Sequence, residues 1–463
     1  MEEVAKYEEY TKEELIEIIL DQNQTIVELS QAILELKKEI EALKPALPKD
    51  STNSSIPSSK ELIRRTRSQR KKSGKKPGGQ QGHQGHYRER TPHPDKIVLV
   101  QASHCADCGA SLSLVEGTLG LIAQEVDIPP ITPLTTEYQQ VIKVCACGHS
   151  NSLPLPIEGY VNIGPQMGAL ITYFNVEHSF PYERLSKVAT DVLGFVISEG
   201  TIANKLRHML SQAKGIVQQI KDHVIAAPWI GSDETGTRVA GKTWWEWVWQ
   251  SPLASYFVID PRRGYPAVQE HFTETYQGVI CHDCWSAQNK TPAAAHQLCH
   301  AHLVRNVQYA IDKERSVWGY LVQRLLLKSQ RARDAIWQQG VSAQKRKAVI
   351  QYYQDTLASL LERPLTKPEE RRLQKRLIKH KEWIFTFMAY PDVPPDNNSS
   401  ERAIKAAKLK DKISGGFRSE SGACRFAQLL SLTQTLRKQH LPILPTLTAI
   451  FQGIEGAVPF LSG

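Results

Sequence analysis

The stretch WIGSDETGTRVAGKTWWEWVWQ, from Trp229 to Gln250, places two adjacent acids, Asp233 and Glu234, at the end of an apolar run. The run before these acids is typical of a buried strand, and the aromatic run after a turn at Gly241 is typical of a second strand. Desolvating a charged carboxylate is costly, so an acid at the end of a buried strand needs an explanation. The carboxylate of Asp233 is either a turn or helix-capping group, or a metal ligand.

The segments after this hairpin predict a mixed order of strands and helices. The run SYFVID (255–260) is typical of a third strand, PAVQEHF (266–272) of a short helix, and GVICHD (278–283) of another strand. We expect Asp283 to emerge at the end of that last strand, as Asp233 does at the end of the first. Two strand-end carboxylates are therefore expected in one α/β core.

A third acid, Glu401, lies in the stretch PPDNNSSERAIKAAK. Asp396 or Asn397 can cap the helix that this stretch predicts, so Glu401 falls in its first turns. Hard cations such as Mg²⁺ prefer oxygen ligands, and two ions about 3.5–4 Å apart support phosphoryl transfer. We therefore predict a site for two Mg²⁺ (or Mn²⁺) ions formed by Asp233, Asp283 and Glu401.

Length and composition limit the classes of protein. The chain has 463 residues, 41% hydrophobic and 23% charged, which is enough for two to four domains with substantial cores. No run of 18 uncharged apolar residues occurs, and the acidic start MEEVAKYEEYTKEEL lacks the apolar core of a signal peptide. We therefore expect a cytoplasmic protein whose eight cysteines are metal ligands or core residues rather than disulfides.

The positive charge is concentrated in one segment. Residues 60–90 carry eleven Lys or Arg and two acids, so their net charge of +9 equals that of the whole chain. This pattern favours a polyanionic partner, with a solvated basic linker as the alternative. Gly, Pro and Ser dominate around it, which predicts a segment without a packed core that orders on DNA phosphates. The basic residues that we predict to contact DNA here are Arg70, Lys71, Lys72, Lys75 and Lys76.

The N-terminal segment carries a heptad repeat. Ile recurs every seventh residue between 19 and 40, and Leu fills the alternate position between 15 and 43, except at Gln22. Ile at a and Leu at d favour a parallel two-stranded coiled coil, in which a polar core residue such as Gln22 can set the register. We predict a homodimer through residues 15–43; the alternative is an amphipathic helix that packs on its own chain.

Two cysteine pairs, in CADCG and CACG, are typical of zinc knuckles. Each pair is followed by a glycine, which lets backbone amides approach a thiolate, and four thiolates suit tetrahedral Zn²⁺. We predict one structural zinc in a small β module; the alternative is four buried thiols. The predicted ligands are Cys105, Cys108, Cys145 and Cys147.

Two further segments are predicted to be helical. In YERLSKVATDVLGFVISEGTIANKLRHML, a helix, a turn at Gly194 and a second helix from about Ser198 follow the helix-turn-helix order, although any helical hairpin has this pattern. Residues 310–390 hold two glycines and show apolar residues at helical spacing, which predicts an all-helical insertion.

These patterns together predict a multidomain α/β chain. Its expected parts are a coiled-coil leucine-zipper helix (1–45), a basic Ser/Gly/Pro-rich linker (46–95), a zinc-binding β module (96–158), a helical, helix-turn-helix-like region (159–225), a catalytic core in two pieces (226–309 and 391–440) around the helical insertion (310–390), and a C-terminal tail (441–463).

Several blocks resemble the insertion sequence 66 family of transposases over nearly the whole chain. These blocks are SDETGTRV, CHDCWSAQN, LCHAHLVRNV and NNSSERAIKAAKLKDKISGGFRSESGACRFAQLLSL, and the last is the most specific. The order of zipper, Ser-rich linker, GGQQGHQGH, cysteine pairs and core is also similar to that of the family.

The resemblance implies a ribonuclease-H-like catalytic core with an Asp-Asp-Glu triad, in which Asp233, Asp283 and Glu401 take the three positions in order. It implies a bacterial, nucleoid-associated DNA transposase that acts on the terminal inverted repeats of its element and on target double-stranded DNA. Water would cut the strand first, and the freed 3′-OH would then attack the target. Accessory transposition proteins are known partners in the family. Basic residues after the third acid that we expect to clamp phosphates near the metals are Lys405, Lys408, Lys410, Lys412 and Arg418.

One block departs from the family pattern. Cys281, Cys284, Cys299 and His302 have the spacing of a second zinc site. However, Cys281 falls within a predicted strand, and CHAH is similar to a family block near the active site. His300 or His302 is then either a phosphate contact or proton shuttle, or a structural histidine.

A non-catalytic DNA-binding protein, built as a zipper dimer with a zinc module, would explain residues 1–150 equally well. A resolvase-like nuclease would share the core but lack the zipper and the cysteine pairs. The transposase hypothesis predicts that Asp233, Asp283 and Glu401 converge within metal-bridging reach, and carboxylates more than about 10 Å apart would contradict two-metal catalysis.

Overall fold

The computed structural model describes residues 82–84, 88–157, 159–337 and 341–458. The predicted coiled coil and the basic residues from Arg70 to Lys76 lie outside this described part. The chain forms two compact units, which we describe separately. The larger unit contains residues 163–181 and the chain from Asn204 onward, and the smaller unit contains the described residues up to Asn162 together with Tyr182–Ala203.

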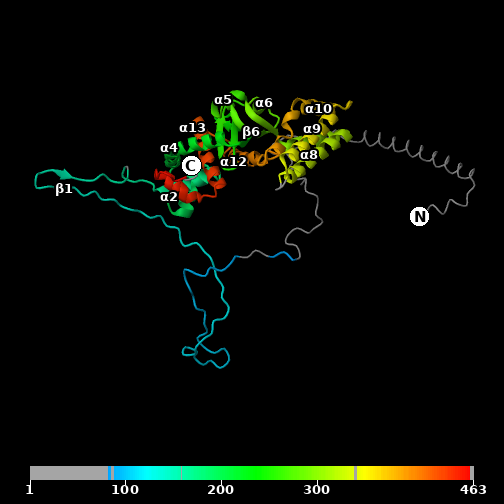
Figure 1. Ribbon diagram of the computed structural model, residues 1–463. Helices are drawn as coiled ribbons and strands as arrows, with labels where there is room; N and C mark the ends of the chain where they lie inside the picture. The colour runs from blue at the N-terminus through cyan, green and yellow to red at the C-terminus, as the bar shows by residue number, and fades with distance from the viewer. Residues whose placement is uncertain (1–81, 85–87, 158, 338–340, 459–463) are drawn as a thin grey trace, which may run out of the picture. The chain divides into compact units, whose positions relative to one another are not determined.

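Among the described residues of the larger unit, five strands form one mixed sheet in the order β5-β4-β3-β6-β7. Strand β6 of this sheet is labelled in Figure 1. Strands β3, β4 and β5 are antiparallel, whereas β6 is parallel to β3, and β7 is parallel to β6. The predicted order of three antiparallel strands, a short helix and a further strand is confirmed. The strands are β3 (Trp229–Val239), β4 (Lys242–Gln250), β5 (Ser255–Asp260), β6 (Tyr276–His282) and β7 (Ala293–Leu298), with α5 (Tyr265–His271) before β6 and α6 (Ser286–Asn289) after it.

Strand β3 is longer than the sequence pattern predicts. It does not end at Asp233 but continues to Val239, because its pairing with β4 runs from Gly231 to the hairpin turn. Ala240 and Gly241 form that turn with φ values of 48° and 76°, which match the positive φ angles of a tight hairpin turn. Asp233 therefore lies inside a strand, and only the parallel pairing of β3 with β6 stops before it.

Two helices near the C-terminus pack on this sheet, α12 (Asn398–Ser414) against β3 and β4, and α13 (Glu420–Lys438) against β5. Hydroxyl groups of α13 accept hydrogen bonds from backbone amides along the outer edge of β5. The backbone N–H of Phe257 donates to Ser431 Oγ at 2.8 Å, and that of Ser255 donates to Thr435 Oγ1 at 3.1 Å. Edge amides that would otherwise lack partners are satisfied in this way, which fixes α13 in register with the sheet.

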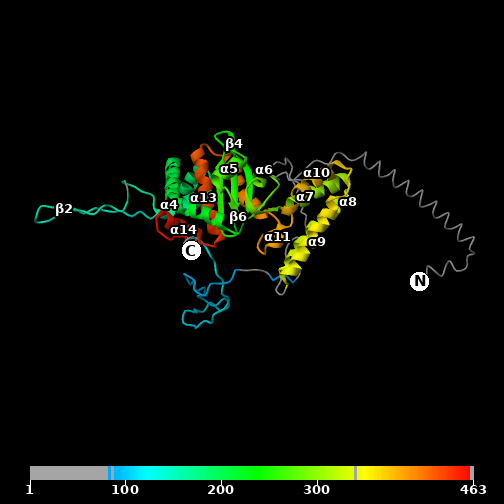
Figure 2. The same ribbon diagram turned by 45° about the horizontal axis from the view of Figure 1, so that its top comes forward.

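The chain between β7 and α12 is helical, as predicted, but its first helix begins at His300, ten residues before the expected start of the insertion. Its elements are α7 (His300–Glu314), α8 (Val317–Ile336), α9 (Ala343–Leu361), α10 (Pro368–Lys379), the 3-10 helix η3 (Lys381–Trp383) and α11 (Thr386–Ala389). Helices α8 and α9 lie side by side (Figure 2). Their buried apolar residues form one cluster with Val279, Cys281 and Leu298 of the sheet. The helical segment is therefore packed on the sheet through a common core.

Two short helices complete the larger unit, α2 (Pro165–Val176) and α14 (Ile443–Phe451), which contact each other. A Cβ at Gly168 would lie 2.2 Å from the Phe451 ring, so glycine is required for this close approach. Helix α4 (Glu199–Ala226) begins in the smaller unit and continues into the larger one. Among the described helices, none is both long and apolar enough to cross a membrane.

The smaller unit contains the cysteine pairs and helix α3 (Tyr182–Leu193), which ends just before Gly194 at φ 61°. Strands β1 (Lys143–Val144) and β2 (Ser150–Asn151) pair across the second cysteine pair, and an isolated bridge joins His104 to Ser111 across the first. Each cysteine pair thus lies in a short turn between paired residues.

Candidate active site

Asp233 and Asp283 both lie just beyond the point where the parallel pairing of β3 with β6 ends, which we call the acidic edge. Gly231 and Cys281 form the last residue pair between β3 and β6, and each acid lies two residues beyond that pair. Residues two apart along a strand point to the same face. The register therefore directs both carboxylates to one face of the sheet, at the point where the parallel pairing ends.

Helix α12 brings Glu401 to this edge because Gly231 has no side chain. A Cβ at Gly231 would lie 2.3 Å from Ser400 Oγ and 2.6 Å from Asn397 Oδ1. Asn397 Nδ2 donates to the Ser232 carbonyl at 2.7 Å, and Gln250 Nε2 donates to Ser400 Oγ at 3.0 Å. These contacts hold the first turn of α12, which carries Glu401, against β3 beside Asp233.

The far end of α12 is also held against the β3–β4 hairpin. Thr237 Oγ1 donates to Asp411 Oδ1 at 2.7 Å, and Phe417 exchanges backbone hydrogen bonds with Arg238 and Ala240 at 2.7 and 2.8 Å. Gly416, at φ 113°, permits this contact, since a Cβ there would lie 2.5 Å from the Arg238 carbonyl oxygen. Attachment at both ends fixes the axial position of the helix.

The three acids are close enough to influence one another electrostatically. Burial raises the pKa of Asp233 well above its usual range, and the charges of Glu234, Asp283 and Glu401 raise it further. Burial and Glu401 also raise the pKa of Asp283, whereas the Trp285 amide and Arg263 act in the opposite direction. Carboxylates that repel each other in a partly buried site favour a bound cation or a shared proton.

Arginines and a histidine of the helical segment lie close to these acids. Arg305 Nη2 lies 3.2 Å from Glu401 Oε1, and His302 Nδ1 lies 3.5 Å from the same oxygen. Burial lowers the pKa of His302 to about 3, and the charges of Arg305 and Arg376 act in the same direction. Arg376 of α10 also lowers the pKa of Asp283. The helical segment therefore supplies positive charge to the acidic edge.

A fourth acid, Glu234, lies next to Asp233 and was not assigned a role from the sequence. Arg263 Nη2 lies 3.0 Å from Glu234 Oε1, and Gln288 Nε2 donates to Oε2 at 2.8 Å. The Arg263 guanidinium stacks between two indoles, 3.7 Å from the Trp285 ring centroid and 4.2 Å from that of Trp245. Burial, together with Asp283, raises the pKa of Glu234 to about 8 despite these partners.

This Arg263 clamp, formed by Glu234, Arg263, Trp245, Trp285 and Gln288, adjoins the second acid. Trp285 N–H donates to Asp283 Oδ1 at 2.9 Å, so the same residue stacks on Arg263 and orients Asp283. The adjacency of Glu234 to Asp233 was the one sequence signal for this clamp, since nothing in the local pattern identifies Arg263 as its partner.

One predicted auxiliary residue, His300, and one predicted DNA contact, Lys410, are buried. His300 is fully buried, with its Nε2 2.7 Å from the Ile384 carbonyl and its Nδ1 3.3 Å from Gln330 Nε2, which favours the alternative of a structural histidine. Lys410 is also buried, and its Nζ lies 5.5 Å from the Phe426 ring centroid. Burial lowers the pKa of Lys410 to about 8, which argues against a phosphate-clamping role. The other predicted clamp residues are more accessible: Lys405, Lys412 and Arg418 are exposed and Lys408 is half-buried.

The four predicted zinc ligands lie in two separate turns. Cys105 and Cys108 lie in one turn, and Cys145 and Cys147 lie in another. Hydrogen bonds from neighbouring backbone amides lower the pKa of Cys105 and Cys145, and the largest contributions come from the amides of Cys108 and Cys147. Among the described residues, the clusters of three or more potential metal ligands do not include these four, so the zinc module stays a prediction.

The second cysteine pattern is not assembled as its spacing suggests. Of Cys281, Cys284, Cys299 and His302, only the last two belong to a common cluster of potential ligands, and their third member is Glu401. Cys281 Sγ instead lies 3.9 Å from the Pro394 carbonyl in the buried core.

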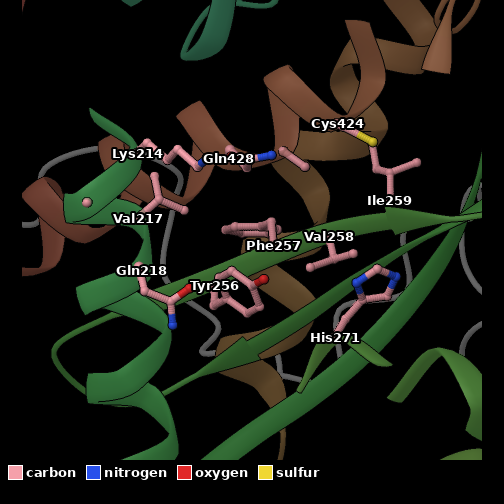
Figure 3. A pocket seen from close by; sticks show the side chains of 12 residues that line it. Lys214, Val217, Gln218, Tyr256, Phe257, Val258, Ile259, His271, Cys424 and Gln428 are labelled. Atoms are coloured by element: carbon pink, nitrogen blue, oxygen red, sulfur yellow. The ribbon is translucent and has the colours of Figure 1, made fainter. Parts of the chain in front are cut away.

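A separate cavity of about 550 Å³ lies between α4, β5 and α13 (Figure 3). Its lining includes Lys214, Tyr256, His271 and Cys424, whose side chains are drawn in the figure. None of the three acids lines it, so this cavity is distinct from the acidic edge.

Comparison with known proteins places this geometry in a family. The model of the Transposase IS66 family matches residues 161–425, more than half of the chain, and this range includes all three acids. A family of unknown function (DUF6444) matches residues 8–89. The chain is also similar to the uncharacterized protein y4hP of Sinorhizobium fredii, with 23% identity over 402 residues, covering 75% of this chain and 71% of that protein. The chain belongs to the IS66 family of transposases.

Proposed function

We propose that Asp233, Asp283 and Glu401 form the catalytic site of a DNA transposase that cleaves and joins strands at the ends of its element. The observation that carries this proposal is the shared offset of Asp233 and Asp283 from the last β3–β6 pair, with the first turn of α12 held over the same edge by Gly231. The strand order β5-β4-β3-β6-β7 with its antiparallel and parallel halves supports a ribonuclease-H-like core.

The residues fit a site for two divalent cations. Three carboxylates supply oxygen ligands, the preferred donors of Mg²⁺ and Mn²⁺, and their mutual repulsion is relieved by positive charge. When bound, such ions activate the attacking oxygen and stabilise the leaving oxygen of an in-line displacement.

The protein orients two of the carboxylates through backbone amides. Glu234 N–H donates to Asp233 Oδ1 at 2.9 Å, and Trp285 N–H donates to Asp283 Oδ1 at the same distance. We assign Oδ2 of each side chain to the metal, because Oδ1 is already used to fix the orientation. Hydrogen bonds of this kind commonly orient the carboxylates that bind a metal ion.

The surrounding cations would bind the DNA backbone. Arg305 and Arg376 lie beside Glu401 and Asp283, and the exposed Lys405, Lys412 and Arg418 follow Glu401. These side chains neutralise phosphates without reading sequence. A water molecule is the first nucleophile in this proposal, and the 3′-OH released by cleavage is the second.

The remaining parts of the chain are assigned to DNA binding and assembly. We propose that the helix-turn-helix-like region (159–225), the zinc module (96–158) and the basic linker (46–95) bind the transposon end, while the zipper (1–45) forms the dimer. The proposed domain map is completed by the two core pieces (226–309 and 391–440), the insertion (310–390) and the tail (441–463).

Strand cleavage of a labelled DNA that carries the terminal repeat of the element tests this proposal. We expect nicking at the repeat end that requires Mg²⁺, stops with EDTA and is lost in D233N. A control is D355N, because Asp355 is an exposed acid of α9 whose carboxylate accepts a hydrogen bond from Gln351 of the same helix. Binding of the repeat without any nicking, even with candidate accessory proteins added, would favour the alternative of a non-catalytic zipper-dimer DNA-binding protein.

A further inference from the structure

Three potential metal ligands of different chemistry meet where helices α7 and α12 begin. Cys299 Sγ, His302 Nδ1 and a carboxylate oxygen of Glu401 all lie within 4.8 Å of one another. Cys299 precedes α7, His302 lies in its first turn, and Glu401 lies in the first turn of α12. Two of these residues come from the unassembled cysteine pattern, and the third is the last acid of the proposed triad.

The backbone holds this cluster in place. The Asn397 amide donates to Cys299 Sγ at 3.2 Å, and the His300 amide donates to the Pro395 carbonyl at 2.9 Å. The starts of the two helices are therefore joined directly. Burial raises the pKa of the Cys299 thiol to about 12, although the Asn397 amide acts in the opposite direction. The thiolate therefore requires a bound cation as its partner.

The spacing of the ligand atoms fits a small tetrahedral ion. Zn²⁺ bonds of about 2.0–2.3 Å in a tetrahedron place nitrogen, oxygen and sulfur ligands about 3.3–3.6 Å apart. His302 Nδ1 and Glu401 Oε1 are 3.5 Å apart, which is long for a hydrogen bond but suits two ligands of one ion. His302 Nδ1 is buried and, in the described part of the chain, has no hydrogen-bond partner.

We propose that Cys299, His302 and Glu401 bind a thiophilic divalent cation such as Zn²⁺, and that this ion competes with the catalytic ions for Glu401. Thiolate and imidazole ligands suit Zn²⁺ and disfavour Mg²⁺, which requires oxygen. Three protein ligands leave a fourth position for water. The side chains of Glu401 and His302 are 28% and 17% exposed, which gives the ion a path from solvent.

Arg305 opposes this ion. Its Nη2 lies 3.2 Å from the oxygen of Glu401 that faces His302, so a bound cation must weaken or displace that ion pair. Removal of the Arg305 charge should therefore strengthen metal binding, a gain that damage to the fold would not produce.

Metal titration of the full chain tests the site. After the zinc content is measured, Cd²⁺ is titrated and thiolate-to-metal absorbance is followed in wild type, C299S, H302Q, R305Q and the control C284S. We expect C299S and H302Q to bind Cd²⁺ at least about tenfold more weakly, since even the loss of a hydrogen-bond partner of a metal ligand lowers metal affinity 10–100-fold. R305Q should bind more tightly, and C284S should match wild type because Cys284 is outside the cluster.

Two results would overturn the site. If C299S, with an unchanged circular dichroism spectrum, binds Cd²⁺ with the affinity of wild type, Cys299 is not a ligand. If C284S loses as much absorbance and affinity as C299S, the ion is bound by the C-x2-C and C-x2-H pattern rather than by this cluster.

The competition with catalysis rests on the proposed function and has its own test. Zn²⁺ added to Mg²⁺-dependent cleavage should slow wild type, and C299S should need at least about tenfold more Zn²⁺ for the same fractional loss of its own zinc-free rate. Equal sensitivity of the two proteins would refute the competition. Absence of cleavage in every protein would contradict the proposed function and leave the Cd²⁺ result standing.

Discussion

Gly231 is the position at which a small change should have the largest effect on the active site. In G231A the new Cβ would lie 2.3 Å from Ser400 Oγ and 2.6 Å from Asn397 Oδ1. Ordinary contact begins at 3.4 Å, so the start of α12 must move away by roughly 1 Å, a misplacement that costs about 100-fold in rate at an enzyme active site.

Rotation of the Ser400 and Asn397 side chains would not remove this clash without breaking hydrogen bonds. Ser400 is fully buried and its Oγ accepts a hydrogen bond from Gln250, while the side-chain amide of Asn397 donates a hydrogen bond to the Ser232 carbonyl. Breaking either bond leaves a buried polar group unsatisfied, which costs about 1–3 kcal/mol. The helix is therefore expected to shift, and Glu401 moves with it.

The assay is single-turnover cleavage of terminal-repeat DNA at saturating Mg²⁺, with thermal unfolding measured on the same samples. We expect G231A to cleave about 100-fold more slowly and to lose about 1–3 kcal/mol of stability from overpacking. The double variant G231A/S400A, which removes the nearest clashing atom, should recover part of the rate. The control is G236A on the same strand, where the new Cβ would meet the Trp245 ring at an ordinary 3.8 Å.

Cleavage by G231A within threefold of wild type, with G236A also active, would refute the reasoning. It would mean that the approach of α12 to β3 does not set the position of Glu401. An equal loss in both variants would instead indicate a general effect on the strand.

Three further predictions concern charge and metal. E246Q should be more stable than wild type above pH 5, because burial, with Asp411, raises the folded pKa of Glu246 to about 8, so that folding favours the protonated form. The wild type then loses stability as the pH rises from about 4.5 towards 8, by about 3 kcal/mol at pH 7. Urea unfolding should show that the difference in free energy of unfolding between E246Q and wild type is larger at pH 8 than at pH 5. R263A should shift the acid limb of the cleavage pH–rate profile to higher pH, because Arg263 lowers the pKa of Asp283, and R263K should restore part of the shift; a parallel drop in rate without a shift would contradict this. C105S/C108S should lose one zinc per chain by metal analysis, whereas C424S should retain it.

The neighbouring positions of Asp233 and Asp283 could be predicted from the sequence, whereas their assignment to a catalytic triad came from the resemblance to a family. Asp233 and Asp283 each follow an apolar run that must be buried, and the parallel pairing of these runs places them side by side. The extent of β3 could not be predicted in the same way. Its second half is stabilised by pairing with β4, and an exposed residue such as Gly236 interrupts the apolar pattern there.

The burial of Lys410 could have been predicted from the spacing of apolar residues along α12. Ile404, Ala407 and Lys410 follow one another at intervals of three residues, so they share one face of α12 and are all buried. A lysine on that stripe is expected to pack its stem against apolar neighbours, here Phe426, rather than reach DNA. By contrast, the partners of Glu234 could not be predicted, since Arg263 and Gln288 come from loops and helices whose positions depend on the assembled sheet.

The helical segment after β7 contributes charge to the site as well as stability to the core. It shares apolar packing with Val279, Cys281 and Leu298, which precede Asp283 and Cys299 on adjacent strands. Its arginines, Arg305 and Arg376, face the acids, and their charges would otherwise have to come from solvent ions or DNA. Because the same segment packs under β6 and pairs with Glu401, a movement of it on DNA binding would change both the position of Asp283 and the partner of Glu401. We therefore propose that the helical segment between β7 and α12 is part of the active site, and that Arg305 pairs with Glu401 until a phosphate or a metal ion takes its place.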